Sequence, residues 1–169
     1  LAYHLAKLGW KDVILLERKK LTSGTTWHAA GLIGQLRANL NMTRLAKYSA
    51  DLYTKLEEET GVATGWHGCG AIRLAITDEQ AEWYRYVQGV LELIGIESHL
   101  IGPNEIPEHA PLIEDLSDIR LGFWTPHDGW SDPTGSTNAM AAGARQLGTE
   151  IARHTLVTGM RQLPDHRWE

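Results

Sequence analysis

Apolar positions recur along the chain with two periods, one typical of helices and one typical of strands. Within the first eight residues, leucines fall at helical spacing, at positions Leu1, Leu5 and Leu8. Gly9 follows them and predicts a helix that ends in a left-handed residue. Residues 12–17, DVILLE, are then almost continuously apolar up to Glu17, which predicts a strand buried on both faces, as in a parallel sheet. The chain is therefore expected to open inside a β-α-β unit whose first strand lies before Leu1.

Three further helices are predicted from the same periodicity. Residues 44–61 place four apolar side chains on one face before Gly61: Leu45, Tyr48, Leu52 and Leu56. A second helix begins at a capping box formed by Thr77 and Gln80, and its apolar positions before Gly95 are Trp83, Val87, Leu91 and Ile94. A third has Asp132 as its cap and Pro133 in its first turn, and runs to Gly148.

Strands are predicted between these helices. Residues 71–76 alternate, so that Ile72, Leu74 and Ile76 form one buried face. Apolar runs predict further strands at 96–101 and 120–125, and two more within 150–163. Residues 18–40 are expected to be a loop, and the three prolines in 102–111 allow only a short helix. The alternation predicts an α/β fold with additional antiparallel strands.

Composition argues against several classes of protein, namely nucleic-acid-binding, membrane-spanning and disulfide-rich proteins. The chain has 169 residues, enough for one domain with a core, and a formal net charge of −5. Its lysines and arginines do not gather into a long basic stripe, which argues against nucleic acid as a partner. No apolar run approaches the roughly 18 residues of a transmembrane segment. The single cysteine, Cys69, excludes an internal disulfide framework and fits a reducing compartment.

Glu17 is the first candidate functional residue. An acid that closes the second strand of a β-α-β unit is where a dinucleotide-binding fold holds the ribose hydroxyls of adenosine. The glycine fingerprint of such a fold would lie roughly 20 residues earlier, before Leu1. The alternative, an ion pair with Arg18 or a nearby lysine, is equally consistent with the pattern.

His28 is the second candidate, in the stretch TTWHAAG at residues 25–31. From the pattern alone we favour a structural or solvent-facing histidine, because the other histidines are scattered and show no metal-binding spacing. We interpret Cys69 as a small packing residue. In PHDGWSDP, residues 126–133, metal binding is an alternative, but turn and cap chemistry explains the residues and is preferred.

Several stretches together resemble one family. They are ILLER, LTSGTTWHAAGL, KLEEETG, GAIRLA, PHDGWSDP and AAGAR. The chain is similar over nearly its whole length to the FAD-dependent sarcosine and dimethylglycine dehydrogenases of the D-amino-acid-oxidase-like flavoenzyme superfamily. The resemblance implies an FAD-binding Rossmann-like domain with part of an antiparallel-sheet substrate domain, here an N-terminal fragment truncated at both ends. The nucleotide-binding part would be residues 1–60 and about 133–169, and the substrate part about 61–132.

The resemblance also implies specific cofactor contacts. His28 corresponds to the histidine that carries a covalent link to the 8α-methyl carbon of the flavin in this family. Glu17 would bind the adenosine ribose, with Arg18 beside it, and Val157 on a later strand would contact adenine through its backbone. Small neighbours would let the backbone approach the flavin and pyrophosphate. The remaining expected FAD contacts are Gly24, Thr25, Thr26, Trp27, Ala29, Ala30, Gly31 and Leu32.

The implied reaction is oxidation of an N-methyl amine such as sarcosine or dimethylglycine, by hydride transfer to flavin N5. The product would be formaldehyde or a one-carbon unit on tetrahydrofolate, and the electron acceptor an electron-transfer flavoprotein. The location would be the mitochondrial matrix in a eukaryote and the cytoplasm in a bacterium. No catalytic residue is identifiable, and we expect little activity from these 169 residues alone. The alternatives are a non-catalytic regulatory or scaffold relative, and an oxidase rather than a dehydrogenase.

Overall fold

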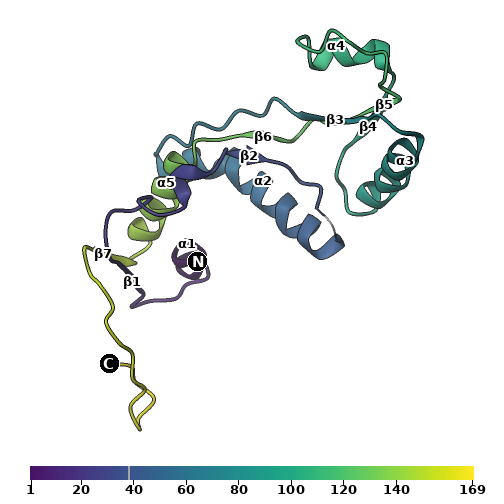
Figure 1. The fold of residues 1–169 in the computed structure, drawn as a ribbon. Coiled ribbons are helices and arrows are strands. Elements are labelled where there is room, and N and C mark those ends of the chain that lie inside the picture. Colours follow the sequence, from purple (N-terminus) through teal and green to yellow (C-terminus); the bar gives the residue numbers. More distant parts are fainter. Residues whose placement is uncertain (38) are drawn as a thin grey trace. The chain divides into compact units, whose positions relative to one another are not determined.

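The computed structural model describes residues 1–37 and 39–169 (Figure 1). These residues form two compact units, each assembled from separated stretches of the chain. The first unit comprises Leu1–Ala30, Lys55–Gly65 and Asp132–Glu169. The second comprises Gly31–Thr54 and Trp66–Ser131. The long helix α2, Leu40–Thr60, begins in the second unit and ends in the first.

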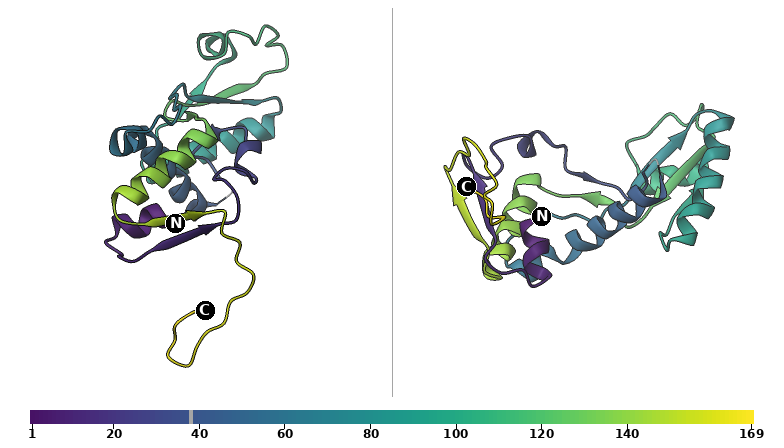
Figure 2. Two further views of the ribbon diagram at one scale, coloured as in Figure 1. Left: turned by 90° about the vertical axis from the view of Figure 1, so that its left-hand side faces the viewer. Right: turned by 90° about the horizontal axis from the view of Figure 1, so that it is seen from below.

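The first unit is built on two parallel strands. Strand β1, Ile14–Glu17, pairs in parallel with β7, Glu150–Arg153, from Ile14 opposite Glu150 to Glu17 opposite Arg153. Figure 2 shows the two strands side by side, with helix α5, Pro133–Gln146, next to them. Parallel strands require a long connection between them, and here it includes the whole second unit. The parallel pairing predicted for residues 12–17 is therefore confirmed.

Helices α1, Ala2–Lys7, and α5 pack closely in this unit. A Cβ atom on Gly143 would lie 2.6 Å from Cε2 of Tyr3, so only glycine allows this approach. Asp132 caps α5 as predicted, because its carboxylate accepts the backbone N–H groups of Thr134 and Gly135, each at 2.9 Å. The cap interpretation of this aspartate is thus confirmed.

The second unit contains a three-stranded antiparallel sheet in the order β3-β5-β4. Its strands are β3, Ala71–Ala75; β4, His99–Ile101; and β5, Leu121–Thr125. Helix α3, Asp78–Leu93, begins at the predicted capping box and lies beside this sheet (Figure 1). Its Val87 and Leu91 pack with Phe123 of β5. A second cluster joins Ile101 of β4 to Ile106 and Ile119, with Ile72 and Trp124 of the sheet packed against it. The antiparallel strands predicted for the middle of the chain are confirmed.

Short elements complete the second unit. Strands β2, Leu32–Ile33, and β6, Gly129–Trp130, pair in antiparallel fashion. The proline-rich segment forms only the short helices η2, Pro103–Glu105, and α4, Ile106–His109, as its composition predicts. None of the helices in the described part of the chain is long and apolar enough to cross a membrane.

Several predicted apolar faces are only partly buried. The buried residues of α1 are Tyr3 and Ala6, while Leu1 and Leu8 are exposed, so the face predicted from leucine spacing was wrong. Strand β1 is not buried on both faces, since Ile14 and Leu16 are 53% and 45% exposed. Continuous hydrophobicity identified the strand and its parallel pairing, but burial depends on what packs against each face. Four further side chains that the periodicity placed on apolar faces are also exposed: Leu45, Tyr48, Ile76 and Trp83.

Residues 150–163 form one strand rather than the two predicted. Strand β7 ends at Arg153, and His154 then takes a left-handed φ of 58°. Residues 155–161 have no strand assignment, and the segment after them makes a single bridge, between Gln162 and Trp168. Val157 therefore follows a strand rather than lying on one, because β-branched sequence alone does not supply a partner strand.

One ion pair in the first unit makes stability depend on pH. The Glu59 carboxylate accepts hydrogen bonds from Lys7 Nζ, at 2.7 Å, and from the Tyr3 hydroxyl. These bonds, with that from Lys7 the larger cause, hold the pKa of Glu59 below its ordinary value of 4.5. A depressed acid pKa stabilises the fold above the unfolded pKa, and this contribution disappears as the pH falls through the folded pKa.

We therefore expect Glu59→Gln to lower the free energy of unfolding at neutral pH by less than about 1 kcal/mol, since the pair is partly solvated. The difference from wild type should shrink as the pH falls below 4.5. Urea unfolding between pH 7 and pH 3 measures this, with Glu58→Gln as the matched control. An equal difference at both ends of the range would contradict the assignment.

Candidate functional site

Glu17 lies at the carboxyl end of β1, the edge where ligands bind in parallel α/β sheets. Its Oε1 atom accepts the backbone N–H of Lys19 at 2.7 Å. Within the described residues Glu17 forms no salt bridge, so the alternative of an ion pair with Arg18 or a lysine is not found. The half-buried carboxylate keeps its second oxygen for a further donor.

His28 lies at the end of a single helical turn, η1, Thr26–His28. The turn is closed by the backbone N–H of His28, which donates to the carbonyl of Thr25 at 3.1 Å. Both His28 and Trp27 are exposed, and their ring centroids lie 3.7 Å apart. The imidazole is therefore placed on the surface of the first unit, oriented by the neighbouring indole. It does not contribute to the core.

The small residues after His28 continue in extended conformation. Ala29 has φ −70° and ψ 139°, and both Ala29 and Ala30 are exposed. Gly31 takes a left-handed φ of 78°, a conformation that glycine adopts without a steric penalty. Gly31 and the exposed Leu32 already belong to the second unit, whereas Gly24, Thr25 and the rest of this stretch belong to the first.

Val157 lies outside any strand, in the segment that follows β7. Two residues earlier, Thr155 donates its backbone N–H to the carbonyl of Glu17 at 2.9 Å. The segment that leads to Val157 therefore passes the carboxyl end of β1, next to Glu17 and Arg18. Val157 itself is 47% exposed.

These residues are compatible with a dinucleotide cofactor. An acid closes a parallel strand, an extended segment runs beside it, and an exposed imidazole follows within the same unit. Each of these groups is accessible, and no metal-binding cluster of His, Cys, Asp or Glu occurs among the described residues. The site as described supplies a carboxylate oxygen and an exposed imidazole, but no assigned acid or base.

Sequence reasoning missed a buried polar network in the second unit. Asp128 is fully buried, and its Oδ1 accepts both the backbone N–H of Gln35, at 3.0 Å, and the Gln35 side-chain amide, at 3.1 Å. Its Oδ2 accepts the Thr125 hydroxyl at 2.7 Å and lies 3.6 Å from Nη1 of Arg73. A buried carboxylate is retained only when its oxygens are paired in this way. The network joins the segment after β2 to strands β3 and β5.

A weak sequence signal for this network exists. Arg73 and Thr125 are polar residues within strands whose other positions are mostly apolar, and Asp128 lies in the motif HDG. Polar residues at buried strand positions require partners, but the sequence does not say which ones. The earlier interpretation of PHDGWSDP as turn and cap chemistry holds for Asp132, while Asp128 has this additional buried role.

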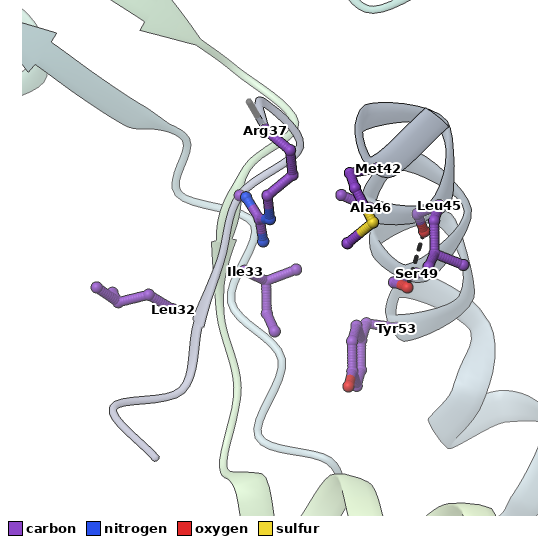
Figure 3. Close-up of a pocket in the computed structure, with 9 residues that line it drawn as sticks. Leu32, Ile33, Arg37, Met42, Leu45, Ala46, Ser49 and Tyr53 are labelled. Carbon is purple, nitrogen blue, oxygen red and sulfur yellow. Dashed lines mark hydrogen bonds between the residues drawn. The ribbon is translucent and has the colours of Figure 1, made fainter. Parts of the chain in front are cut away.

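Two pockets lie on either side of the segment Leu32–Arg37 in the second unit. Figure 3 shows the first, of about 250 Å³, between this segment and α2, with Ile33 directed toward the helix and Leu32 away from it. Leu45, an exposed residue of the predicted core face, lines this pocket with Met42. The second pocket, of about 320 Å³, lies over β3 and includes Arg73 and Trp130. Arg37 lines both pockets.

Comparison with known proteins finds matches that extend over the whole chain. The family model described as "DAO: FAD dependent oxidoreductase" matches residues 1–169. Dimethylglycine dehydrogenase from Rattus norvegicus is 41% identical over 169 residues, which are 100% of this chain and 20% of that protein. Sarcosine dehydrogenase from Homo sapiens is 38% identical over 164 residues, 96% of this chain and 18% of that protein. The chain thus spans about a fifth of these curated relatives.

Among solved structures, the L-proline dehydrogenase from P.horikoshii is similar, with a TM-score of 0.87 and 29% sequence identity. The match covers 97% of this chain and 43% of that one. Both the sequence and the backbone therefore match the same class of protein over nearly every residue.

Proposed function

Because the chain belongs to the FAD dependent oxidoreductase family, we propose that its protein oxidises an N-methyl amine such as sarcosine or dimethylglycine. The observation that carries this proposal is the similarity, over 96% or more of the chain, to two dehydrogenases named for these amines. When bound, FAD supplies the acceptor for the two electrons that leave the carbon–nitrogen unit of the substrate.

In this proposal the first unit binds the adenosine end of the cofactor. Glu17 accepts the ribose hydroxyls with the carboxylate oxygen that Lys19 does not occupy. Arg18 lies beside the adenosine, and the backbone of Val157, a residue that is 47% exposed, contacts adenine. The small side chains at Ala29, Ala30 and Gly31 let the backbone approach the cofactor closely.

His28 is proposed as the residue that attaches the cofactor covalently. The exposed imidazole of His28 can act as a nucleophile in the neutral form, and its tilted contact with the Trp27 indole limits the rotation of the ring. Threonine hydroxyls at Thr25 and Thr26 supply donors nearby. Covalent attachment would keep the cofactor on the protein through many turnovers.

The product, the electron acceptor and the location are proposed from the same similarity to the two dehydrogenases. The product would be formaldehyde or a one-carbon unit carried by tetrahydrofolate, and an electron-transfer flavoprotein would accept the electrons. Because the relatives are named as mitochondrial proteins, we propose the mitochondrial matrix as the location in a eukaryote, and the cytoplasm in a bacterium. We also propose how the chain is divided between cofactor and substrate. Residues 1–60 and about 133–169 would form the nucleotide-binding part, and residues from about 61 to 132 the substrate part.

The test is turnover by the full-length protein. With sarcosine or dimethylglycine as substrate, we expect reduction of an artificial electron acceptor such as dichlorophenolindophenol, and formaldehyde when folate is omitted. Peroxide production under air would instead identify an oxidase. If the flavin-loaded protein reduces no acceptor with either amine, the proposal is wrong, and the non-catalytic scaffold becomes the better hypothesis.

A further inference from the structure

Three helices of the first unit end around one cleft. It has a volume of about 400 Å³, within the range of small-molecule sites. Its lining includes Lys7 at the end of α1, Glu59 in the last turn of α2 and Gln146 at the end of α5. Among the described residues, none of the expected FAD contacts lines this cleft. The cleft is therefore a candidate site that the proposed cofactor binding does not use.

The helices that form the cleft are tied to one another. Gly143 of α5 also lines the cleft, and a Cβ atom on it would lie 2.6 Å from Cε2 of Tyr3 and 2.9 Å from Cγ2 of Thr60. The side-chain nitrogen of Gln146 donates to the carbonyl of Thr60 at 2.9 Å, which joins the end of α5 to the end of α2. These contacts hold the cleft in shape without a ligand, so a ligand would not have to order it.

Two oxygen atoms of the cleft are available as hydrogen-bond acceptors. Lys7 Nζ and the Tyr3 hydroxyl both donate to Oε2 of Glu59, and Oε1 of this carboxylate accepts no hydrogen bond from the described residues. Gln146 uses its amide nitrogen for Thr60, while its amide oxygen has no donor in the same part of the chain. Carboxylate and amide oxygens can only accept hydrogen bonds. These two side chains therefore suit a ligand that donates.

The charges around the cleft favour a cation. The negative charge of Glu59 is offset by Lys7, at 2.7 Å. The ends of α2 and α5, helices of 21 and 14 residues, each add roughly half a negative charge. Arg145, in the last turn of α5, is exposed and does not line the cleft, so it offsets the dipole of α5 only in part.

We propose that this cleft binds the ammonium group of a small ligand, with Glu59 Oε1 and Gln146 Oε1 as its acceptors. An ammonium group supplies both the positive charge and the N–H donors, and hydrogen bonds to a carboxylate are stronger than those between neutral groups. A free alkylamine and a zwitterionic amino acid both carry this group. Lys7 keeps further N–H groups, which would bind the carboxylate of an amino acid.

The identity of the ligand and the existence of the site are separate questions. That the ligand is a substrate or product amine of the protein rests on the proposed function. The ammonium site itself rests on the cleft, its two acceptors and its charges, and is tested without turnover.

The experiment measures binding to the full-length protein by saturation-transfer difference NMR, under nitrogen and without an electron acceptor. The probes are methylammonium, a free amine, and glycine, a zwitterion. The variants are Glu59→Gln and Lys7→Gln, with Glu58→Gln as the matched control at an exposed glutamate. The side chains of Lys7 and Glu59 are 40% and 35% exposed, so the loss of their ion pair should leave the protein folded.

Glu59→Gln should weaken the binding of both probes by about tenfold, because an ammonium group loses its charged acceptor. Lys7→Gln should strengthen methylammonium binding, since a competing cation is removed, and should weaken glycine binding, since the partner of its carboxylate is removed. Opposite shifts of the two probes in one variant do not arise from misfolding. Glu58→Gln should bind both probes as wild type does.

The two probes also distinguish the sources of the ammonium group. Binding of methylammonium alone, lost in Glu59→Gln, identifies a free amine as the ligand, and binding of glycine alone with this dependence identifies an amino acid. Binding that is unchanged in Glu59→Gln lies elsewhere and overturns the proposal, as does the absence of binding of either probe to wild type. If wild type oxidises neither sarcosine nor dimethylglycine, the proposed function fails, while the NMR measurement still decides whether the ammonium site exists.

Discussion

Replacing His28 with alanine in the full-length protein is expected to abolish the flavin that stays with the polypeptide after acid precipitation. The proposed bond requires an imidazole nitrogen as nucleophile, and alanine offers none. His28 is exposed and its ring contacts Trp27 rather than the core, so the variant should fold with a change in stability within about 0.5 kcal/mol. Absorbance of the precipitate near the flavin bands, or flavin fluorescence of the band in a denaturing gel, measures the retained cofactor.

The control is His127→Ala, which removes another exposed histidine, in the second unit. It should retain its flavin as wild type does. A second variant, Trp27→Phe, keeps a ring beside the imidazole and should form the bond more slowly rather than lose it. Covalent flavin that persists in His28→Ala would place the attachment elsewhere, or show that the bond does not involve this stretch.

Asp128→Ala is expected to destabilise the second unit by about 3–5 kcal/mol, as when one partner is removed from a buried ion pair. The fully buried carboxylate accepts hydrogen bonds from Gln35 and Thr125 and pairs with Arg73. Alanine leaves these buried donors without an acceptor, and each unsatisfied donor carries a desolvation cost. Urea unfolding of the full-length protein, with amide hydrogen exchange at Gln35 and along β5, measures the effect.

Asp128→Asn should destabilise the second unit less than Asp128→Ala does. One side-chain oxygen remains to accept the two N–H groups of Gln35, while the amide nitrogen replaces the oxygen near Arg73. Asp118→Ala, at an exposed position, is the control and should leave exchange at Gln35 unchanged. If the Gln35 amide of Asp128→Ala exchanges as slowly as that of wild type, the network does not hold the segment after β2.

Local features of this protein could be predicted because their causes lie within a few residues of one another. The capping box at Thr77 and Gln80 and the cap at Asp132 were confirmed, and the glycines predicted to end four helices all have positive φ. A side-chain oxygen three residues from a backbone N–H is already within reach before the chain folds. Resemblance of whole stretches of sequence then identified the family, which periodicity alone did not.

Predictions failed where burial depends on distant segments. Leu45 and Tyr48 lie on the apolar stripe of α2 and are nevertheless half-exposed, because the spacing of residues defines a face but not what covers it. In the same way the β-branched sequence around Val157 does not make a strand, since no neighbouring strand pairs with it in the described residues. A strand requires hydrogen bonds to a partner far away in the sequence.

The sequence by itself determined the caps at Thr77 and Asp132, the glycines that end the helices, the parallel and antiparallel strand classes and the family. It also predicts the candidate cofactor residues from Glu17 to Leu32. Only the tertiary structure decided that Gln35, Arg73, Thr125 and Asp128 form one network. The reason is that hydrogen bonds and ion pairs act over a few ångströms in space. Residues separated by up to 93 positions come within that distance only when strands β2, β3 and β5 have been assembled.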